Sequence, residues 1–131
     1  MKTVLFACVH NAGRSQMAAA FFGAFADPKK ARALSAGTKP ADRVHPEVVA
    51  AMNELGIDLS RATPRELTET LAAEADVLVT MGCGDACPVV PGVERIDWPL
   101  EDPKGQSPEA VRRIRSAIRE KVLRLLTDRG W

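Results

Sequence analysis

Short apolar segments alternate with helix-forming segments along the whole chain, and this alternation restricts the possible folds more than any other feature. The apolar segments are residues 2–8, 32–36, 76–81 and 93–98. Their lengths are typical of strands, and the nearly uniform apolar character of 76–81 indicates a strand that is buried on both faces. Strands that alternate with helices pair in parallel. We therefore predict an α/β fold with a four-stranded parallel sheet flanked by helices on both faces.

Capping signals predict where the helices begin and end. We expect helices over residues 14–25, 45–55 and 107–127, and a further short helix starting at Thr63-Pro64. Pro46 suits a first helical turn and Gly56 suits a helix end, because proline lacks an N–H donor and glycine tolerates a left-handed conformation. Ser107 is predicted to cap the last helix.

Length and charge limit the classes of function. The 131 residues are most simply a single domain over 1–131, and the net charge of +1 gives no reason to expect a nucleic-acid or membrane partner. The apolar start of the chain is too short for a signal peptide, and no segment approaches the roughly 20 apolar residues of a membrane span. We expect a cytoplasmic protein.

The stretch CVHNAGRS, residues 8–15, follows the first predicted strand and carries the clearest chemical signal. Backbone amides of such a loop, together with the start of the following helix, can point at a tetrahedral oxyanion. The oxyanion-binding loop is Val9, His10, Asn11, Ala12, Gly13, Arg14 and Ser15. Arg14 can hold two anion oxygens with its planar fork, and the positive environment is expected to keep Cys8 ionised at neutral pH.

The small and polar residues of this loop have their own expected parts. Gly13 permits a close backbone approach, Asn11 can adopt a left-handed conformation or bond across the loop, and Ser15 can donate to the Cys8 sulfur. The alternative is a buried structural cysteine before a helix cap. Cysteine, arginine and serine at this spacing after a strand favour the anion-binding interpretation.

These motifs resemble the low-molecular-weight tyrosine phosphatase superfamily, and CVHNAGRSQMA is similar to its arsenate reductase branch. The resemblance also covers SAGT at 35–38, VTMGCGDACP at 80–89 and DWPLEDP at 97–103. It implies a four-stranded parallel sheet flanked by helices, as in flavodoxin-like layering. It also implies that Asp102 is the acid that protonates the leaving oxygen, because hydroxide and alkoxide are poor leaving groups.

The resemblance leaves two activities to distinguish. Phosphatases of this family carry aromatic residues after the Asp-Pro pair, whereas this chain has Lys104-Gly105 there and no tyrosine anywhere. Trp98 is the candidate for part of an aromatic wall. The missing residues favour a small inorganic oxyanion over an aryl phosphate.

Two further cysteines favour reduction, since arsenate reduction takes two electrons and thiols supply them by forming a disulfide. The resemblance implies that Cys8 forms a thiol–arsenate adduct, that Cys83 attacks Cys8, and that Cys87 then attacks Cys83. The oxidised pair would lie on a surface loop within reach of thioredoxin. The short spacing also resembles relatives in which a low-molecular-weight thiol and a glutaredoxin-like protein resolve the adduct. The remaining alternative is that one or both cysteines pack inertly under the loop.

We therefore predict an arsenate reductase that binds no cofactor and requires an external thiol reductant. Its predicted partners are arsenate, with phosphate or sulfate as analogues, and thioredoxin or a glutaredoxin-like protein. The alternatives are a low-molecular-weight phosphatase acting on aryl phosphates and an oxyanion or redox sensor without turnover.

No metal site is predicted. Zinc could in principle use the three cysteines with His10 and His45, but the spacing is not that of a zinc knuckle, and the two histidines suit backbone support and a helix start. Some reductases of the family bind potassium beside the loop. Asn11 and Ser35 match that set, whereas Ala19 and Arg65 replace acidic residues, which argues against potassium here.

Overall fold

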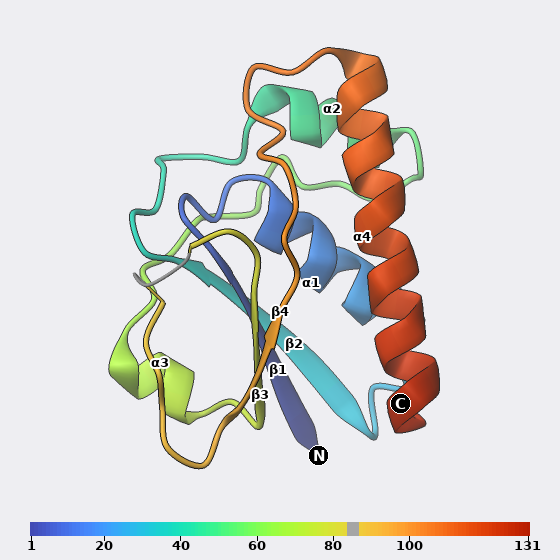
Figure 1. Ribbon diagram of the computed structural model, residues 1–131. Helices are drawn as coiled ribbons and strands as arrows, with labels where there is room; N and C mark the ends of the chain where they lie inside the picture. The colour runs from blue at the N-terminus through green and yellow to red at the C-terminus, as the bar shows by residue number, and fades with distance from the viewer. Residues whose placement is uncertain (84–86) are drawn as a thin grey trace.

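The computed structural model describes residues 1–83 and 87–131, and its centre is a parallel sheet (Figure 1). The strands are β1 (Lys2–Cys8), β2 (Ala31–Gly37), β3 (Val77–Thr80) and β4 (Glu94–Asp97). Their order is β2-β1-β3-β4, and each neighbouring pair is parallel. The prediction of a four-stranded parallel α/β sheet is confirmed.

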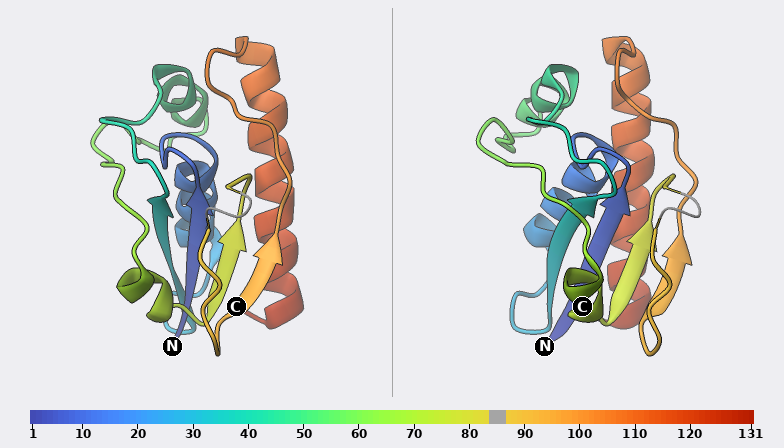
Figure 2. Two further views of the ribbon diagram at one scale, coloured as in Figure 1. Left: turned by 60° about the vertical axis from the view of Figure 1, so that its left-hand side comes forward. Right: turned by 90° about the vertical axis from the view of Figure 1, so that its left-hand side faces the viewer.

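Helices cover both faces of this sheet (Figure 2). They are α1 (Arg14–Phe25), α2 (Pro46–Asn53), α3 (Glu69–Ala73) and α4 (Pro108–Arg129). The larger core cluster joins α1 and α4 to one face, and a smaller cluster joins α3 to the other. Among the described residues, none of the helices combines the length and the apolar composition that crossing a membrane requires.

Successive side chains of β1 point to opposite faces of the sheet, as in any strand. Val4, Phe6 and Cys8 pack in the cluster with α1 and α4, whereas Leu5 and Ala7 pack in the cluster with α3. Both sets are buried. β1 is therefore apolar and buried at every position from residue 4 to residue 8, and the nucleophile candidate Cys8 lies on the α1 side.

The short helix expected from Thr63-Pro64 is wrong, because the chain is extended there. Gly37 N donates to Arg65 O at 2.9 Å, and Leu67 N donates to Gly37 O at 2.8 Å, so this segment pairs with the end of β2. The helix begins later, where Thr68 Oγ1 accepts from Leu71 N at 3.0 Å and caps α3. Pairing with a distant strand has overridden the local start signal.

All four strands run in the same direction, so their carboxyl ends meet at one edge of the sheet. Figure 2 shows the loop after β1 at this edge, beside α2 and the segment that leads from β4 to α4. In parallel α/β sheets ligands bind at this edge. The fold therefore places the loop at 8–15 in the position where a ligand site is expected.

The α4 packing allows a direct test of the core. Ile118 is fully buried, whereas Leu123 on the same helix is 37% exposed. We expect Ile118→Ala to lower the free energy of unfolding by about 2–5 kcal/mol, because the cavity adds to the lost apolar transfer. Leu123→Ala is the matched control and should cost under about 1 kcal/mol. Urea denaturation measures both, and equal losses would contradict this packing.

Candidate active site

The Cys8 thiol lies at the start of a chain of side-chain hydrogen bonds. Cys8 Sγ is 2.9 Å from Ser15 Oγ, and Asn11 Nδ2 donates to that same oxygen at 2.7 Å. Because the amide already occupies an acceptor site of Ser15, the hydroxyl hydrogen is available to point at the sulfur. Ser15 can thus donate to a Cys8 thiolate. Cys8 is a free thiol with 2% of its surface exposed.

Asn11 stabilises the bend of this loop through its backbone conformation and its hydrogen bonds. Its φ is 50°, in the left-handed region that asparagine tolerates better than most residues. Its side-chain oxygen accepts from Arg65 N at 3.0 Å, while Gln16 Nε2 donates to its backbone carbonyl at 3.1 Å. Both expectations for Asn11, the left-handed conformation and the bond across the loop, are met.

The backbone carbonyls of the loop are held on its outer side. Four of them accept hydrogen bonds from the segment that follows β2. The bonds run from Thr38 N to Cys8 O (3.1 Å), Lys39 N to Val9 O (2.8 Å), Ala41 N to His10 O (2.9 Å) and His45 N to Ala12 O (2.9 Å). Within the described part of the chain, the N–H groups of residues 10–15 donate to no protein acceptor. The loop therefore leaves these N–H donors open, as anion binding requires.

The first turn of α1 adds to this positive potential. No described side chain caps its N-terminus at Gly13, and its first turn contains no acidic residue. The free N–H groups at a helix start carry a partial positive charge. An anion in the loop would thus satisfy donors that the fold leaves open.

The Arg14 side chain is held from two later segments of the chain. It is 7% exposed, Nη1 donates to Leu100 O at 3.2 Å, and Nη2 lies 3.9 Å from Asp102 Oδ2. Gly82 covers the guanidinium so closely that a Cβ there would overlap Arg14 Nη1. Leu100 takes one of the five N–H donors of the arginine. The ends of β1, β3 and β4 thus converge on this side chain.

Asp102 lies beside this arginine on a fixed turn. Its side chain is 44% exposed, and Lys104 N donates to Asp102 Oδ1 at 3.0 Å. Pro103 packs against the loop, because a Cβ on Gly13 would come within 2.8 Å of Pro103 Cγ. The structure therefore brings Asp102 to Arg14, beside the loop that begins at Cys8, and the close approach at Gly13 is made by a proline ring.

The two histidines lie near this site without entering the Cys8 network. Their ring centroids are 6.4 Å apart, and His10 Nδ1 is 3.0 Å from Lys39 O. Residue 45 is the N-cap of α2, as expected from Pro46. Burial lowers the pKa of His45, against the opposing pull of the Glu47 and Asp102 carboxylates. His45 is therefore neutral at pH 7.

The residues beside the loop do not suit a potassium ion. Arg65 Nε donates to Ser35 O at 3.0 Å, so a guanidinium already lies against an oxygen that potassium would need. The amide oxygen of Asn11 is taken by Arg65 N. Within residues 1–83 and 87–131, no group of three or more histidine, cysteine or acidic side chains is placed to hold a metal.

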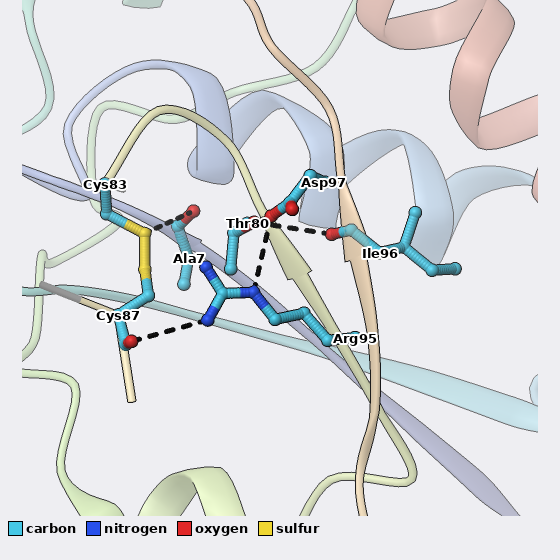
Figure 3. A network of polar contacts seen from close by, with 7 residues as sticks. All are labelled: Ala7, Thr80, Cys83, Cys87, Arg95, Ile96 and Asp97. Carbon is cyan, nitrogen blue, oxygen red and sulfur yellow. Dashed lines mark hydrogen bonds and ion pairs between the residues drawn. A yellow bond between two sulfur atoms is a disulfide. The ribbon is translucent and has the colours of Figure 1, made fainter. Parts of the chain in front are cut away.

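Cys83 and Cys87 form a disulfide with a Cα–Cα separation of 5.6 Å, within the usual range for this bond (Figure 3). Cys83 Sγ lies 3.9 Å from Ala7 O, next to the nucleophile candidate in the chain. The expected exposure of the pair is wrong: Cys83 and Cys87 are 7% and 2% exposed, because they pack in the core cluster of α3. Reduction by another protein therefore requires a local opening.

Trp98 does not form an aromatic wall at the site. Its ring is 8% exposed and lies 5.8 Å from the Phe6 ring, in the core cluster of α1 and α4. The register of β4 turns this side chain toward the helices. The residues after Asp102 thus offer no aromatic slot, since Lys104 and Gly105 follow Pro103.

Sequence reasoning missed three residues that shape the site: Gly82, Pro103 and Arg95. A glycine directly after a buried strand was the available signal for Gly82, and its φ of 97° excludes most other residues. In the sequence, Pro103 stands out only as the second residue of the Asp-Pro pair. Nothing in the sequence marks Arg95, whose Nη1 lies 3.5 Å from Cys87 O.

Comparison with known proteins places this geometry in a family context. A family model described as low molecular weight phosphotyrosine protein phosphatase matches residues 3–129. A glutaredoxin arsenate reductase of Synechocystis is 40% identical over 129 residues, which cover 96% of this chain and 97% of the relative.

Solved structures agree in fold along almost the whole chain. A thioredoxin-dependent arsenate reductase of Corynebacterium glutamicum superposes with a TM-score of 0.84 at 38% identity over 98% of this chain. This chain spans only 61% of that protein. A second structure, described as an arsenate reductase in oxidized state, gives a TM-score of 0.85 at 37% identity and covers 98% of both chains.

Proposed function

This chain belongs to the low molecular weight phosphotyrosine protein phosphatase family, and we propose that within it the protein reduces arsenate to arsenite. The observation that carries the proposal is the Cys83–Cys87 disulfide. It follows β3 directly, and the residue before it, Gly82, covers the arginine of the anion loop. Phosphoryl transfer needs no redox pair, whereas two-electron reduction of an oxyanion does.

The first step is attack on arsenate bound in the loop. The loop amides and the Arg14 guanidinium hold its oxygens, and the Cys8 thiolate displaces one of them to form a sulfur–arsenic bond. Asp102, 3.9 Å from the guanidinium, gives the departing oxygen a proton. Its 44% exposure allows it to exchange that proton with water.

The second step transfers the electrons. Cys83 sulfur attacks Cys8 sulfur, the sulfur–arsenic bond breaks, and its electron pair leaves with arsenic as arsenite. Cys87 then attacks Cys83 and releases the Cys8 thiolate. The final state is the Cys83–Cys87 disulfide seen in the structure, with Cys8 free.

Cys83 must move toward Cys8 for the second step and return to pair with Cys87. Cys8 packs on the α1 face of the sheet, whereas the disulfide packs on the α3 face. Gly82, with φ in the left-handed region, is where this segment leaves the strand. In the proposed cycle, a Cys83–Cys87 disulfide with a free Cys8 is the oxidised state.

The cycle also needs an external electron donor that reduces the Cys83–Cys87 disulfide. One relative is named for glutaredoxin and another for thioredoxin. We propose a thiol-disulfide protein of the thioredoxin or glutaredoxin type as the partner, because the buried disulfide must be returned to two thiols after each cycle.

A reductant-swap experiment tests the proposal. Arsenite production would be measured with thioredoxin and its reductase, and separately with a small thiol plus glutaredoxin, for the wild type, Cys83→Ser and Cys87→Ser. The intramolecular relay predicts that each variant keeps less than about a tenth of the thioredoxin-driven turnover. Activity that survives in both variants would place the second thiol outside the chain.

The same assay separates the remaining alternatives. A phosphatase would release phosphate from an aryl phosphate without any reductant, and we expect this activity to be weak because no aromatic residue follows Asp102-Pro103. A sensor would bind arsenate or phosphate stoichiometrically and show no turnover with any thiol. Either outcome, together with no arsenite, would overturn the proposed function.

A further inference from the structure

Arg95 of β4 reaches across to the disulfide from the neighbouring strand. Its Nη1 lies 3.5 Å from the backbone oxygen of Cys87 (Figure 3). The arginine side chain is 29% exposed, whereas Cys87 is almost fully buried. A positive charge is therefore held at the more buried cysteine of the pair, partly shielded from water.

The position of this guanidinium is fixed from β3. Arg95 Nε lies 3.4 Å from Asp97 Oδ1, two residues further along the same face of β4. That carboxylate oxygen also accepts a hydrogen bond from the hydroxyl of Thr80, which is 3% exposed at the end of β3. The Thr80 hydroxyl lowers the pKa of Asp97 most strongly, and Arg95 adds to this effect. The carboxylate is therefore ionised at neutral pH and keeps Arg95 oriented.

These contacts run from the end of β3 to Cys87. Cys83 follows Thr80 by three residues, and Cys87 is bonded to Arg95. The arginine is thus placed relative to the same strand end that carries Cys83. A guanidinium held in this position keeps its charge near Cys87, whereas a freely moving exposed arginine would not.

We propose that Arg95 is a positioning residue that stabilises the Cys87 thiolate and thereby sets the redox balance of the Cys83–Cys87 pair. The proposal rests on the proposed function for its role in catalysis. In that cycle the Cys87 thiolate attacks Cys83 in the Cys8–Cys83 disulfide. One sulfur–sulfur bond forms, the other breaks, and Cys8 leaves as a thiolate, so no external electrons are needed.

Whether Arg95 favours the reduced or the oxidised cysteine pair depends on which of the two carries a negative charge. The disulfide is neutral, whereas the reduced pair contains the thiolate, so a nearby cation favours the reduced form. The same cation raises the fraction of Cys87 that is ionised and able to attack. Arg95 should therefore speed formation of the final disulfide and also make that disulfide easier for an external thiol to reduce.

Other charges near the pair set the size of the effect. Asp97 partly offsets Arg95. Glu94, on the other side of β4, is paired with Arg129 of α4. An opposite charge close to a thiolate shifts its titration by about 1–3 pH units when buried, and we expect the lower end because Arg95 is partly exposed.

The test uses reduced protein in a Cys8→Ser background, which removes exchange with the third cysteine. Alkylation of Cys87 is followed against pH by peptide mass spectrometry. Arg95→Gln should move the midpoint upward by about 0.5–1 pH unit. In a thiol redox buffer at a pH above both midpoints, its ratio of reduced to oxidised pair should fall about 3- to 10-fold, or about 15–30 mV at roughly 30 mV per tenfold.

Two further variants separate charge from mere anchoring. Arg95→Lys keeps the charge, so its midpoint should shift by no more than about a third of the shift in Arg95→Gln. A purely structural role of Arg95 would give both variants the same shift. Arg113→Gln removes an exposed arginine from α4, on the opposite face of the sheet, and should leave the midpoint unchanged. Thermal melts of each variant report whether the fold is intact.

A measurement on the wild-type pair covers the case in which Arg95→Gln does not fold. Raising the ionic strength from about 0.05 to 0.5 M should move the Cys87 midpoint upward, because Arg95 is partly exposed to screening ions. A Cys87 midpoint that is unchanged both at high salt and in Arg95→Gln would overturn the proposal. These readouts involve no arsenate, so a protein that failed to reduce arsenate would contradict the proposed function and leave this test intact.

Discussion

Replacement of Cys8 by serine is expected to abolish arsenite production, with a loss of at least about 1,000-fold in turnover. The serine hydroxyl is not ionised at neutral pH, and an oxygen at this position cannot form the disulfide with Cys83 that releases arsenite. Both the attack on arsenate and the transfer of electrons depend on the sulfur that lies 2.9 Å from Ser15 Oγ. The measurement is arsenite formed with an excess of reductant.

Several controls keep this result interpretable. Serine is close to cysteine in size, so the variant should fold with nearly the wild-type melting temperature. It should still bind phosphate, because the loop amides and Arg14 are unchanged. Its Cys83–Cys87 pair should still form under a chemical oxidant. Turnover that survived in this variant would mean that Cys8 is not the nucleophile.

Replacement of Arg14 by lysine is expected to lower kcat/KM for arsenate by about 100- to 1,000-fold. Lysine keeps the charge but lacks the planar fork that can bond the Leu100 carbonyl and two anion oxygens at once. The ammonium group would also leave the surface of Gly82 that the guanidinium now covers. Steady-state kinetics with arsenate measure the loss of kcat/KM, and calorimetric titration with phosphate measures the loss of anion affinity.

Gly82→Ala tests the same contact from the other side. A Cβ there would overlap Arg14 Nη1, and the φ of 97° is unfavourable for alanine, so arsenate turnover should fall in the same direction as in Arg14→Lys. Gly23→Ala is the matched control, because nothing lies within 4 Å of its added Cβ. This control lies within α1 and should gain about 1 kcal/mol of helix stability without loss of turnover. Unchanged phosphate affinity in Arg14→Lys and in Gly82→Ala would contradict the assigned role of Arg14.

Local patterns in the chain were sufficient for the order of the elements and for the anion loop. The apolar runs predicted all four strands, and the segment 14–25 is a helix with the same bounds in the structure. The succession of strands and helices along the chain and the chemistry of the loop depend on neighbouring residues, whose hydrophobic periodicity and capping signals can be read from the sequence. The loop at 8–15 could be predicted for the same reason, since its parts lie within eight residues.

Contacts between distant segments could not be derived in this way. Residues 63–66 were expected to start a helix, yet Arg65 and Leu67 bond to Gly37, because the end of β2 offers them backbone partners. Trp98 turned inward and the cysteine pair became buried for a similar reason, since the register of the strands chooses the face on which each side chain packs.

The meeting of Arg14 with Gly82 and Leu100, and of Arg95 with Cys87, joins three separate strand ends. A residue's own neighbours in the chain set its secondary structure. Its partners across the sheet are chosen by how whole elements pack and in which register they pair, and that information exists only once the chain has folded.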